Sequence, residues 1–136
     1  MSVSTNTYEN SPTSKAGIIG YWIPTGLLIF ELLYGALWDF NLLNNGYVYD
    51  TLLHLGYPVY LAAILGVSKI LAAIAILIPG FEILKEWAYA GIAILFGGAF
   101  VSHIASGDGL GKYIFAFIFL LISLASWKMK NFRVTQ

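Results

Sequence analysis

The sequence contains no cysteine and very little charge. The absence of cysteine excludes structural disulfides, thiol–disulfide chemistry and cysteine-ligated metal or iron–sulfur centres. Any redox chemistry must therefore use a bound cofactor or a partner chain. Only 10% of the 136 residues are charged and 59% are hydrophobic, whereas a soluble domain carries about 25% charged residues. The formal net charge is zero, so we expect the lipid bilayer, and no nucleic acid, as a partner.

Four long apolar runs predict transmembrane helices. They cover residues 17–38, 58–78, 87–105 and 112–129, and each is close to the roughly 20 residues that a membrane crossing needs. Short connections, such as the one that begins at Pro79-Gly80, predict antiparallel neighbours. We therefore expect an all-α fold, an integral membrane up-down four-helix bundle. Its domain is predicted to span residues 17–130, between a polar N-terminal tail (1–16) and a short C-terminal tail (131–136).

The distribution of basic residues predicts the orientation of the bundle. Six basic residues flank the predicted spans, and five of them are expected on one side of the membrane. These five are Lys15, Lys85, Lys128, Lys130 and Arg133, and the other side holds Lys112 alone. Because basic flanks stay in the cytoplasm, both termini are predicted to be cytoplasmic. The first span lacks a small-residue cleavage site, which favours a retained signal anchor. We expect a multi-pass protein of the cell's inner (plasma) membrane.

Two further features of the spans predict how the bundle is arranged. The connection 39–57 includes TLLHLGYP, which could form a short interfacial helix and a lid, and Pro58 suits the first turn of the next span. Small residues on the second and third spans predict that these two helices approach each other closely. The fourth span has little polarity, so we expect it to be the most exposed to lipid.

Two charged residues lie inside the spans, Glu31 in the first and Lys69 in the second. A charge at the bilayer centre costs about 2.5–3.5 kcal/mol on insertion scales, so such residues usually face the bundle and pair. Counted from the predicted outer ends at ~1.5 Å per residue, Glu31 lies roughly 10 Å deep and Lys69 roughly 16 Å deep. The lysine stem can cover most of that difference. We predict a Glu31–Lys69 ion pair, which either only fixes the helix register or lines a cavity and relays protons.

His103 and Asp108 are predicted to lie together near the outer end of the third span. Asp108 could accept a hydrogen bond from the imidazole and fix its tautomer, although such a pair is more often local capping. All these ionisable residues, with Asp50 and His54, fall in the predicted outer half. We therefore expect an outward-facing polar pocket above a dry inner half, with Lys69 as its floor. Haem ligation by two histidines is disfavoured because His54 lies in a loop, and no metal-spacing motif is present.

The central part of the chain resembles the DoxX-like family of small bacterial membrane proteins. The matching stretches are LGYP at 55–58, LGVSK ending at Lys69, LKEWAYAG at 84–91, and the SH and GD pairs that contain His103 and Asp108. The resemblance implies a four-helix membrane protein of about this length. It places Lys69, His103 and Asp108 at motif positions. Because the family takes its name from a subunit linked to quinol oxidation, it also suggests a quinone ligand, but fold alone does not carry function.

Three functions remain open from the sequence. In the first, the protein binds a lipophilic small molecule such as a quinone and serves membrane redox chemistry. Lys69 would then donate to a carbonyl, Glu31 would position Lys69 or exchange a proton, and His103 with Asp108 would act at the mouth. In the second, the chain is a structural or assembly subunit, acting through self-association or a membrane partner. In the third, it is a small transporter acting as an oligomer, although no inverted repeat is visible.

Overall fold

A computed structural model describes residues 15–43 and 45–130, and every regular element in these ranges is helical. The five helices are α1 (Lys15–Asp39), α2 (Tyr47–Leu55), α3 (Leu61–Leu77), α4 (Glu82–Ala105) and α5 (Leu110–Lys128). The predicted tails fall mostly outside the described residues, although Lys15 and Ala16 already belong to α1. The all-α prediction is confirmed.

The helices α1, α4 and α5 have the length and composition of membrane spans. They contain 25, 24 and 19 residues respectively, and each carries an apolar window long enough to cross a bilayer. The apolar helix α3 has 17 residues, which is the lower limit for a span. It starts at Leu61, so the prediction that Pro58 lies in its first turn is wrong. Pro58 precedes the helix and accepts a hydrogen bond from the Leu61 N–H, 3.1 Å.

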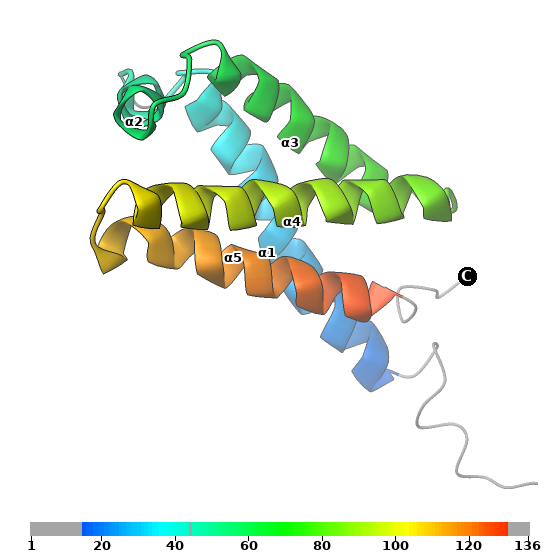
Figure 1. The fold of residues 1–136 in the computed structure, drawn as a ribbon. Helices are drawn as coiled ribbons and strands as arrows, with labels where there is room; N and C mark the ends of the chain where they lie inside the picture. The colour runs from blue at the N-terminus through cyan, green and yellow to red at the C-terminus, as the bar shows by residue number, and fades with distance from the viewer. Residues whose placement is uncertain (1–14, 44, 131–136) are drawn as a thin grey trace, which may run out of the picture.

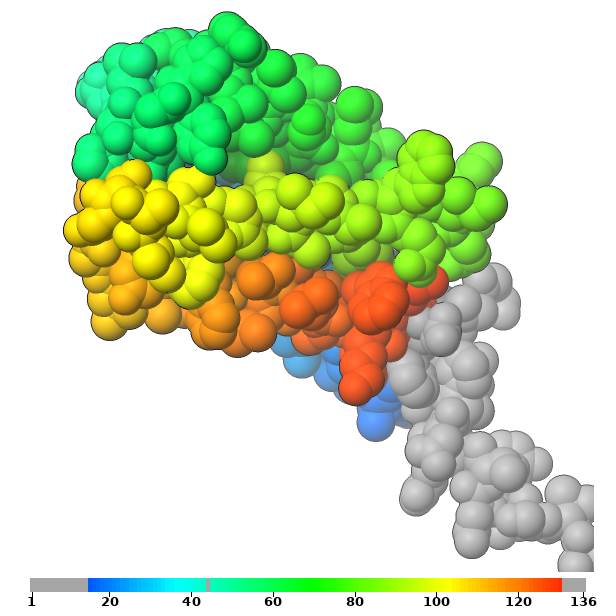
Figure 2. Space-filling model, in the orientation of Figure 1, coloured from blue at the N-terminus to red at the C-terminus, as the bar shows by residue number. Residues whose placement is uncertain are grey.

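The long helices pack in chain order around one core (Figure 1). Helix α1 contacts α3 and α5, and α4 contacts α5 and, less extensively, α3. Where they meet, an apolar cluster is buried. It consists of Leu28, Leu32, Ala73, Ile76, Tyr89, Ile92 and Phe96. Figure 2 shows α4 and α5 lying along each other on one face, with α2 and α3 on the other side of α4.

The outer surface of the bundle is unusually apolar for a protein of this size. Large side chains on it are mostly exposed, among them Phe30 (64%), Trp87 (74%), Ile94 (75%) and Phe115 (66%). A soluble monomer rarely exposes extended apolar surface. The three span-length helices and this surface together identify a membrane protein.

The bundle has two chemically different ends. The α2 end holds α2 and the turn between α4 and α5, and the termini end holds Lys15, Lys128 and the connection between α3 and α4. Helix α2, which the sequence predicted as a short helix in the first connection, stops at Gly56. Gly56 has a left-handed φ of 86°, which glycine adopts without the steric cost of a side chain. The turn directs Tyr57 back toward the bundle.

Helix α4 begins five residues earlier than predicted, and this changes the description of the termini end. Lys85 lies in its first turns rather than in a loop and is only 2% exposed. Its Nζ donates hydrogen bonds to the carbonyls of Ile78 and Gly80, where α3 ends. A buried hydroxyl chain lies at this end too: Ser126 bonds both Thr25 (2.6 Å) and Tyr89 (2.7 Å). The prediction of a dry inner half is therefore wrong.

Candidate functional site

Three charged side chains meet between α1 and α3. Lys69 Nζ lies 2.8 Å from Asp39 Oδ2, and the two side chains are 11% and 6% exposed. Glu31 stands two helical turns before Asp39 on the same face of α1, because residues four apart in a helix are neighbours. The Lys69 ammonium group thus pairs with Asp39 and has the Glu31 carboxyl group nearby. Removing the lysine would leave both carboxyl groups without this positive charge.

Gly35 makes room for this cluster. A Cβ atom at position 35 would lie 2.9 Å from Lys69 Nζ and 3.0 Å from Glu31 Oε1. Both polar atoms therefore rest against the bare backbone of α1 between Glu31 and Asp39. At a second glycine, Gly66 on α3, an added Cβ would lie 2.8 Å from the ring of Phe40. These two glycines set the close approach of α1 and α3 that brings Lys69 to the carboxylates.

The predicted Glu31–Lys69 ion pair is corrected by this geometry. Lys69 is brought next to Glu31, as expected, but the ion pair forms with Asp39. The physical reason lies in the lysine stem, which extends toward the polar end of the bundle as snorkelling lysines do. Helix α1 also continues to Asp39, which sequence reasoning had placed in the loop. The signal that could have found Asp39 is its spacing of eight residues from Glu31.

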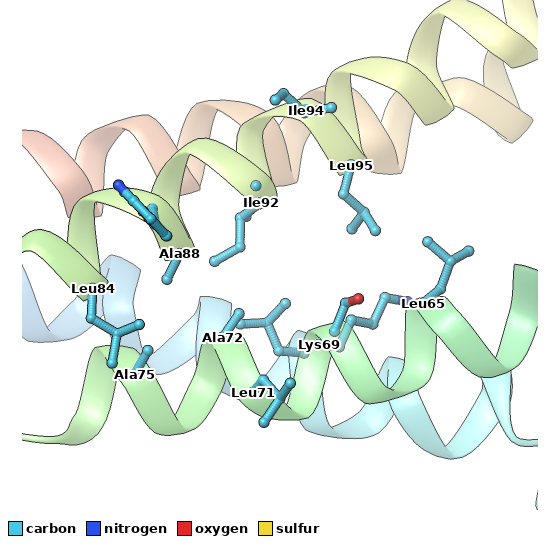
Figure 3. Close-up of a pocket in the computed structure, with 14 residues that line it drawn as sticks. Leu65, Lys69, Leu71, Ala72, Ala75, Leu84, Ala88, Ile92, Ile94 and Leu95 are labelled. Carbon is cyan, nitrogen blue, oxygen red and sulfur yellow. The ribbon is translucent and has the colours of Figure 1, made fainter.

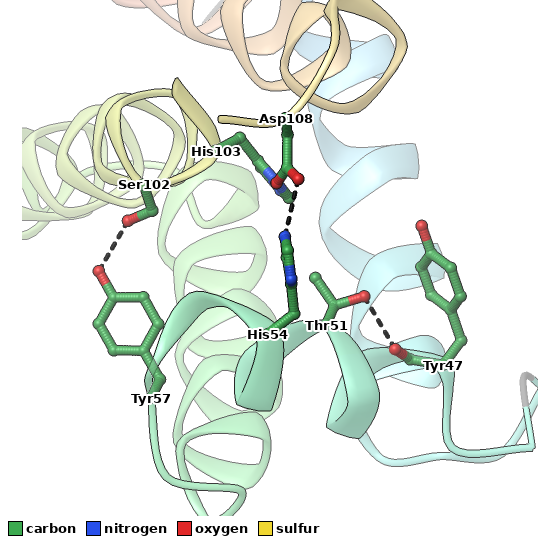
Figure 4. A network of polar contacts seen from close by, with 7 residues as sticks. All are labelled: Tyr47, Thr51, His54, Tyr57, Ser102, His103 and Asp108. Carbon is green, nitrogen blue, oxygen red and sulfur yellow. Dashed lines mark hydrogen bonds and ion pairs between the residues drawn. The ribbon is translucent and has the colours of Figure 1, made fainter. Parts of the chain in front are cut away.

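A second polar cluster joins α2 to the turn between α4 and α5 (Figure 4). Asp108 bridges two imidazoles: its Oδ2 lies 2.7 Å from His103 Nδ1 and its Oδ1 lies 2.7 Å from His54 Nε2. The hydrogen bonds from His103 and then His54 lower the pKa of the Asp108 carboxyl below its ordinary value of 3.8. The predicted contact between His103 and Asp108 is confirmed. His54 is a further member whose role sequence reasoning had left open.

Two more contacts hold α2 and its flanking turn in place. The Tyr57 and Ser102 hydroxyls are 2.7 Å apart, and Lys112 Nζ lies 5.9 Å from the centre of the Tyr47 ring. Figure 4 shows Tyr57 and His54 reaching across to Ser102 and Asp108 from α2 and the turn that follows it. We call these contacts, with the Asp108 bridge, the α2 latch. Tyr57 and Ser102 were not predicted as site residues.

The latch gives a prediction for Asp108→Ala. Losing both imidazole contacts should raise the amide hydrogen-exchange rates of residues 47–55 about fivefold, while those of the α1–α5 core stay unchanged. Because the pKa of Asp108 is lowered, the latch should persist above pH 3.8 and weaken as pH falls through the lowered pKa. Exchange mass spectrometry on wild type and variant from neutral pH downward measures this. A difference that disappears while the pH is still near 6 would contradict it.

Under α2 lies a cavity of about 580 Å³, a size typical of small-molecule sites. Of the four predicted site residues, Glu31, Lys69 and His103 line this cavity, and Asp108 contacts His103 from outside the lining. Its other walls are mainly apolar and aromatic. They include Leu52, Leu61, Leu65, Leu95, Phe96, Phe115 and Phe119. The cavity therefore combines a few polar groups with a large apolar surface.

A second space of about 470 Å³ lies between parts of α3 and α4. The two helices contact each other through the buried core, as predicted, but less extensively than α4 contacts α5. In Figure 3 the side chains of Leu84, Ala88 and Leu95 on α4 point across this space toward α3. At Gly91 an added Cβ would meet no atom within 4 Å. The small residues of α4 thus line an open groove, which we call the α3–α4 groove.

The described residues contain no group of three or more histidine, aspartate and glutamate side chains arranged to hold a metal ion. The two histidines instead share one carboxylate. The chemistry available at the cavity is therefore that of a paired lysine, a neighbouring carboxyl group and an imidazole fixed by Asp108.

Comparison with known protein families gives a match over most of the chain. The family model described as the DoxX-like family matches residues 23–126, a range that begins within α1, ends within α5 and includes Glu31, Lys69, His103 and Asp108. No curated protein and no solved structure matches the chain. Because the matched range covers more than half of the sequence and agrees with the helical membrane architecture, the chain belongs to the DoxX-like family.

Proposed function

We propose that this membrane protein binds a lipophilic small molecule of the quinone type in the cavity under α2, as an accessory to membrane redox chemistry. The observation that carries the proposal is the cavity itself. It is walled by apolar side chains and contains Lys69 beside Glu31 at depth. A charged group kept inside a membrane span is a functional-site candidate by default, because its insertion costs free energy.

Each polar residue has a role in this proposal. Lys69 Nζ donates a hydrogen bond to a ligand carbonyl, which acquires negative charge if the ligand is reduced. Asp39 holds Lys69 in place through the 2.8 Å ion pair. Glu31, which also lines the cavity, accepts or supplies a proton. His103 lies nearer the α2 end, where its contact with Asp108 fixes the ring orientation.

The proposal includes four spans, with α3 as the shortest, both termini in the cytoplasm, and location in the inner membrane. The distribution of lysines supports this orientation, because basic residues that flank membrane spans favour the cytoplasmic side. The termini end holds Lys15, Lys85, Lys128 and Lys130, and the α2 end holds Lys112. The cavity then faces outward. This orientation can be tested with two cysteine variants, Asn41→Cys and Gly80→Cys. The measurement is the labelling of each cysteine by an impermeant thiol reagent in intact cells. Labelling of Gly80→Cys alone in intact cells would contradict it.

The binding function is tested by extracting the gently purified protein and identifying bound molecules by mass spectrometry. Because Lys69→Met alone leaves a buried carboxylate behind, the double variant Lys69→Met/Asp39→Asn is the better test. We expect a quinone-type molecule to copurify with wild type and to fall about tenfold in the double variant. The exposed lysine variant Lys128→Met serves as the control. Equal amounts in all three proteins, or none in wild type, would overturn the proposal.

A structural or assembly role is the second candidate, and one surface feature favours it. Aromatic rings form a continuous row along α1 and onto α2, with Phe30, Tyr34, Trp38 and Tyr47 in successive contact at 5.5, 6.1 and 5.6 Å between ring centres. Phe30 and Tyr34 are largely exposed. Crosslinking in native membranes through Phe30→Cys distinguishes this role. A stoichiometric crosslinked partner that survives the Lys69→Met/Asp39→Asn change would support assembly over binding.

A further inference from the structure

The α3–α4 groove and the cavity under α2 adjoin each other. Leu65, Lys69 and Leu95 line both spaces, so the groove reaches from the lipid-facing side of the bundle to residues that also line the cavity. Figure 3 shows Lys69 and Leu65 on α3 at the end of the groove where Leu95 faces them. The polar head site and the groove thus meet at these three residues.

The groove is apolar along its length and open to the surface. Apart from Ser68 and Lys69, its lining consists of leucine, isoleucine, alanine, glycine and tryptophan. Trp87 and Leu71 at its rim are 74% and 60% exposed. In a membrane protein this surface faces lipid chains. On α4 the lining runs from Leu84 to Leu95, a rise of roughly 16 Å.

The approach to the cavity from the α2 end is partly covered by α2 and its contacts. Leu52 of α2 is buried against the bundle, and the latch connects His54 to Asp108 and Tyr57 to Ser102. These contacts hold α2 across the aqueous approach to the cavity. A molecule dissolved in the bilayer meets the open groove instead.

We infer that the ligand enters laterally from the bilayer and that its apolar chain lies in the α3–α4 groove with its polar head at Lys69. The inference rests on the proposed function and defines its ligand class more narrowly. The ligand is an amphiphile with one hydrogen-bond-accepting head and a long, slender apolar chain. Two features of the groove support a slender chain: its walls at Ala72, Ala75, Ala88 and Gly91 are small, and Lys69 is the single ionisable residue in its lining.

The test fills the groove without disturbing the head site. Gly91→Leu places a side chain in the groove, and nothing within 4 Å obstructs its Cβ. Gly97→Leu is the matched control, because it lies on the same helix, has an equally open Cβ position and lines neither space. Two probes are titrated in lipid nanodiscs, a benzoquinone with a decyl chain and the same benzoquinone without the chain, with tryptophan fluorescence quenching as the readout.

We expect Gly91→Leu to weaken binding of the decyl probe about tenfold and to leave the chainless probe unchanged. Gly97→Leu should bind both probes as wild type does. Suppose that Gly91→Leu binds the decyl probe as wild type does, while Lys69→Met/Asp39→Asn still abolishes binding. This result would overturn lateral entry through the groove but leave the proposed function standing. The groove would then hold ordinary lipid. If the decyl probe instead quenched wild type and the Lys69→Met/Asp39→Asn variant equally, the result would contradict the proposed function. The inference, which rests on that function, would then be wrong too.

Discussion

Lys69→Met should lower the free energy of unfolding by about 3–5 kcal/mol, the usual cost of breaking a buried ion pair by removing one partner. The substitution leaves Asp39, which is 4% exposed, without the ammonium group 2.8 Å from it. Glu31 loses the same neighbour. Adding Asp39→Asn removes most of the uncompensated charge, so the double variant should recover most of the lost stability. Unfolding in mixed detergent micelles measures these differences.

The identity of the lysine's partner can be measured by comparing two double-mutant cycles. The coupling energy between Lys69 and Asp39 should exceed that between Lys69 and Glu31, because only the first pair is in direct contact. Glu31→Gln alone should cost less stability than Lys69→Met. A larger coupling with Glu31 would show that the pairing expected from sequence is right and that the Asp39 pairing is wrong.

Gly35→Ala should lower stability by about 1–3 kcal/mol, the usual cost of overpacking. The new methyl group would lie 2.9 Å from Lys69 Nζ, and the ion pair with Asp39 prevents that atom from moving away freely. Gly26→Ala on the same helix is the matched control, since nothing lies within 4 Å of its Cβ. Replacing that glycine in a helix interior should raise stability by about 0.5–1 kcal/mol.

The two alanine variants should therefore shift stability in opposite directions. Their thermal denaturation in one detergent gives the sign directly. If Gly35→Ala were as stable as Gly26→Ala, Glu31 and Lys69 would not rest against Gly35. The close approach of α1 and α3 at the charge cluster would then be wrong.

Sequence patterns predicted the elements of this protein better than their contacts. Hydropathy located α1 and α5 to within about two residues, and the first connection was expected to contain a short helix, which is α2. The proximity of His103 and Asp108 was also predictable, because a helix end and the following turn keep residues five apart close together. These features depend on local spacing, which a single sequence contains.

The features that sequence reasoning missed depend on tertiary geometry. The partner of Lys69 is set by the direction of its stem and by the continuation of α1 to Asp39. Helices α3 and α4 contact each other as predicted, but Gly91, one of the small residues behind that prediction, lines an open groove. The sequence placed Lys85 in a loop, yet its side chain donates hydrogen bonds to the carbonyls at the end of α3. Neither hydropathy nor spacing distinguishes these alternatives.

The central claim is that Lys69 meets the head of a lipophilic ligand in the cavity under α2. The most direct measurement is the nitrogen-15 resonance of the Lys69 side chain in nanodiscs, assigned by its loss in Lys69→Met/Asp39→Asn, during titration with the decyl benzoquinone. Lys85 is the internal reference, because it is a buried lysine, 2% exposed, that bonds carbonyls at the termini end. The account predicts a saturable shift of the Lys69 resonance while that of Lys85 stays fixed. A Lys69 resonance that does not move, or that moves together with Lys85, would contradict it.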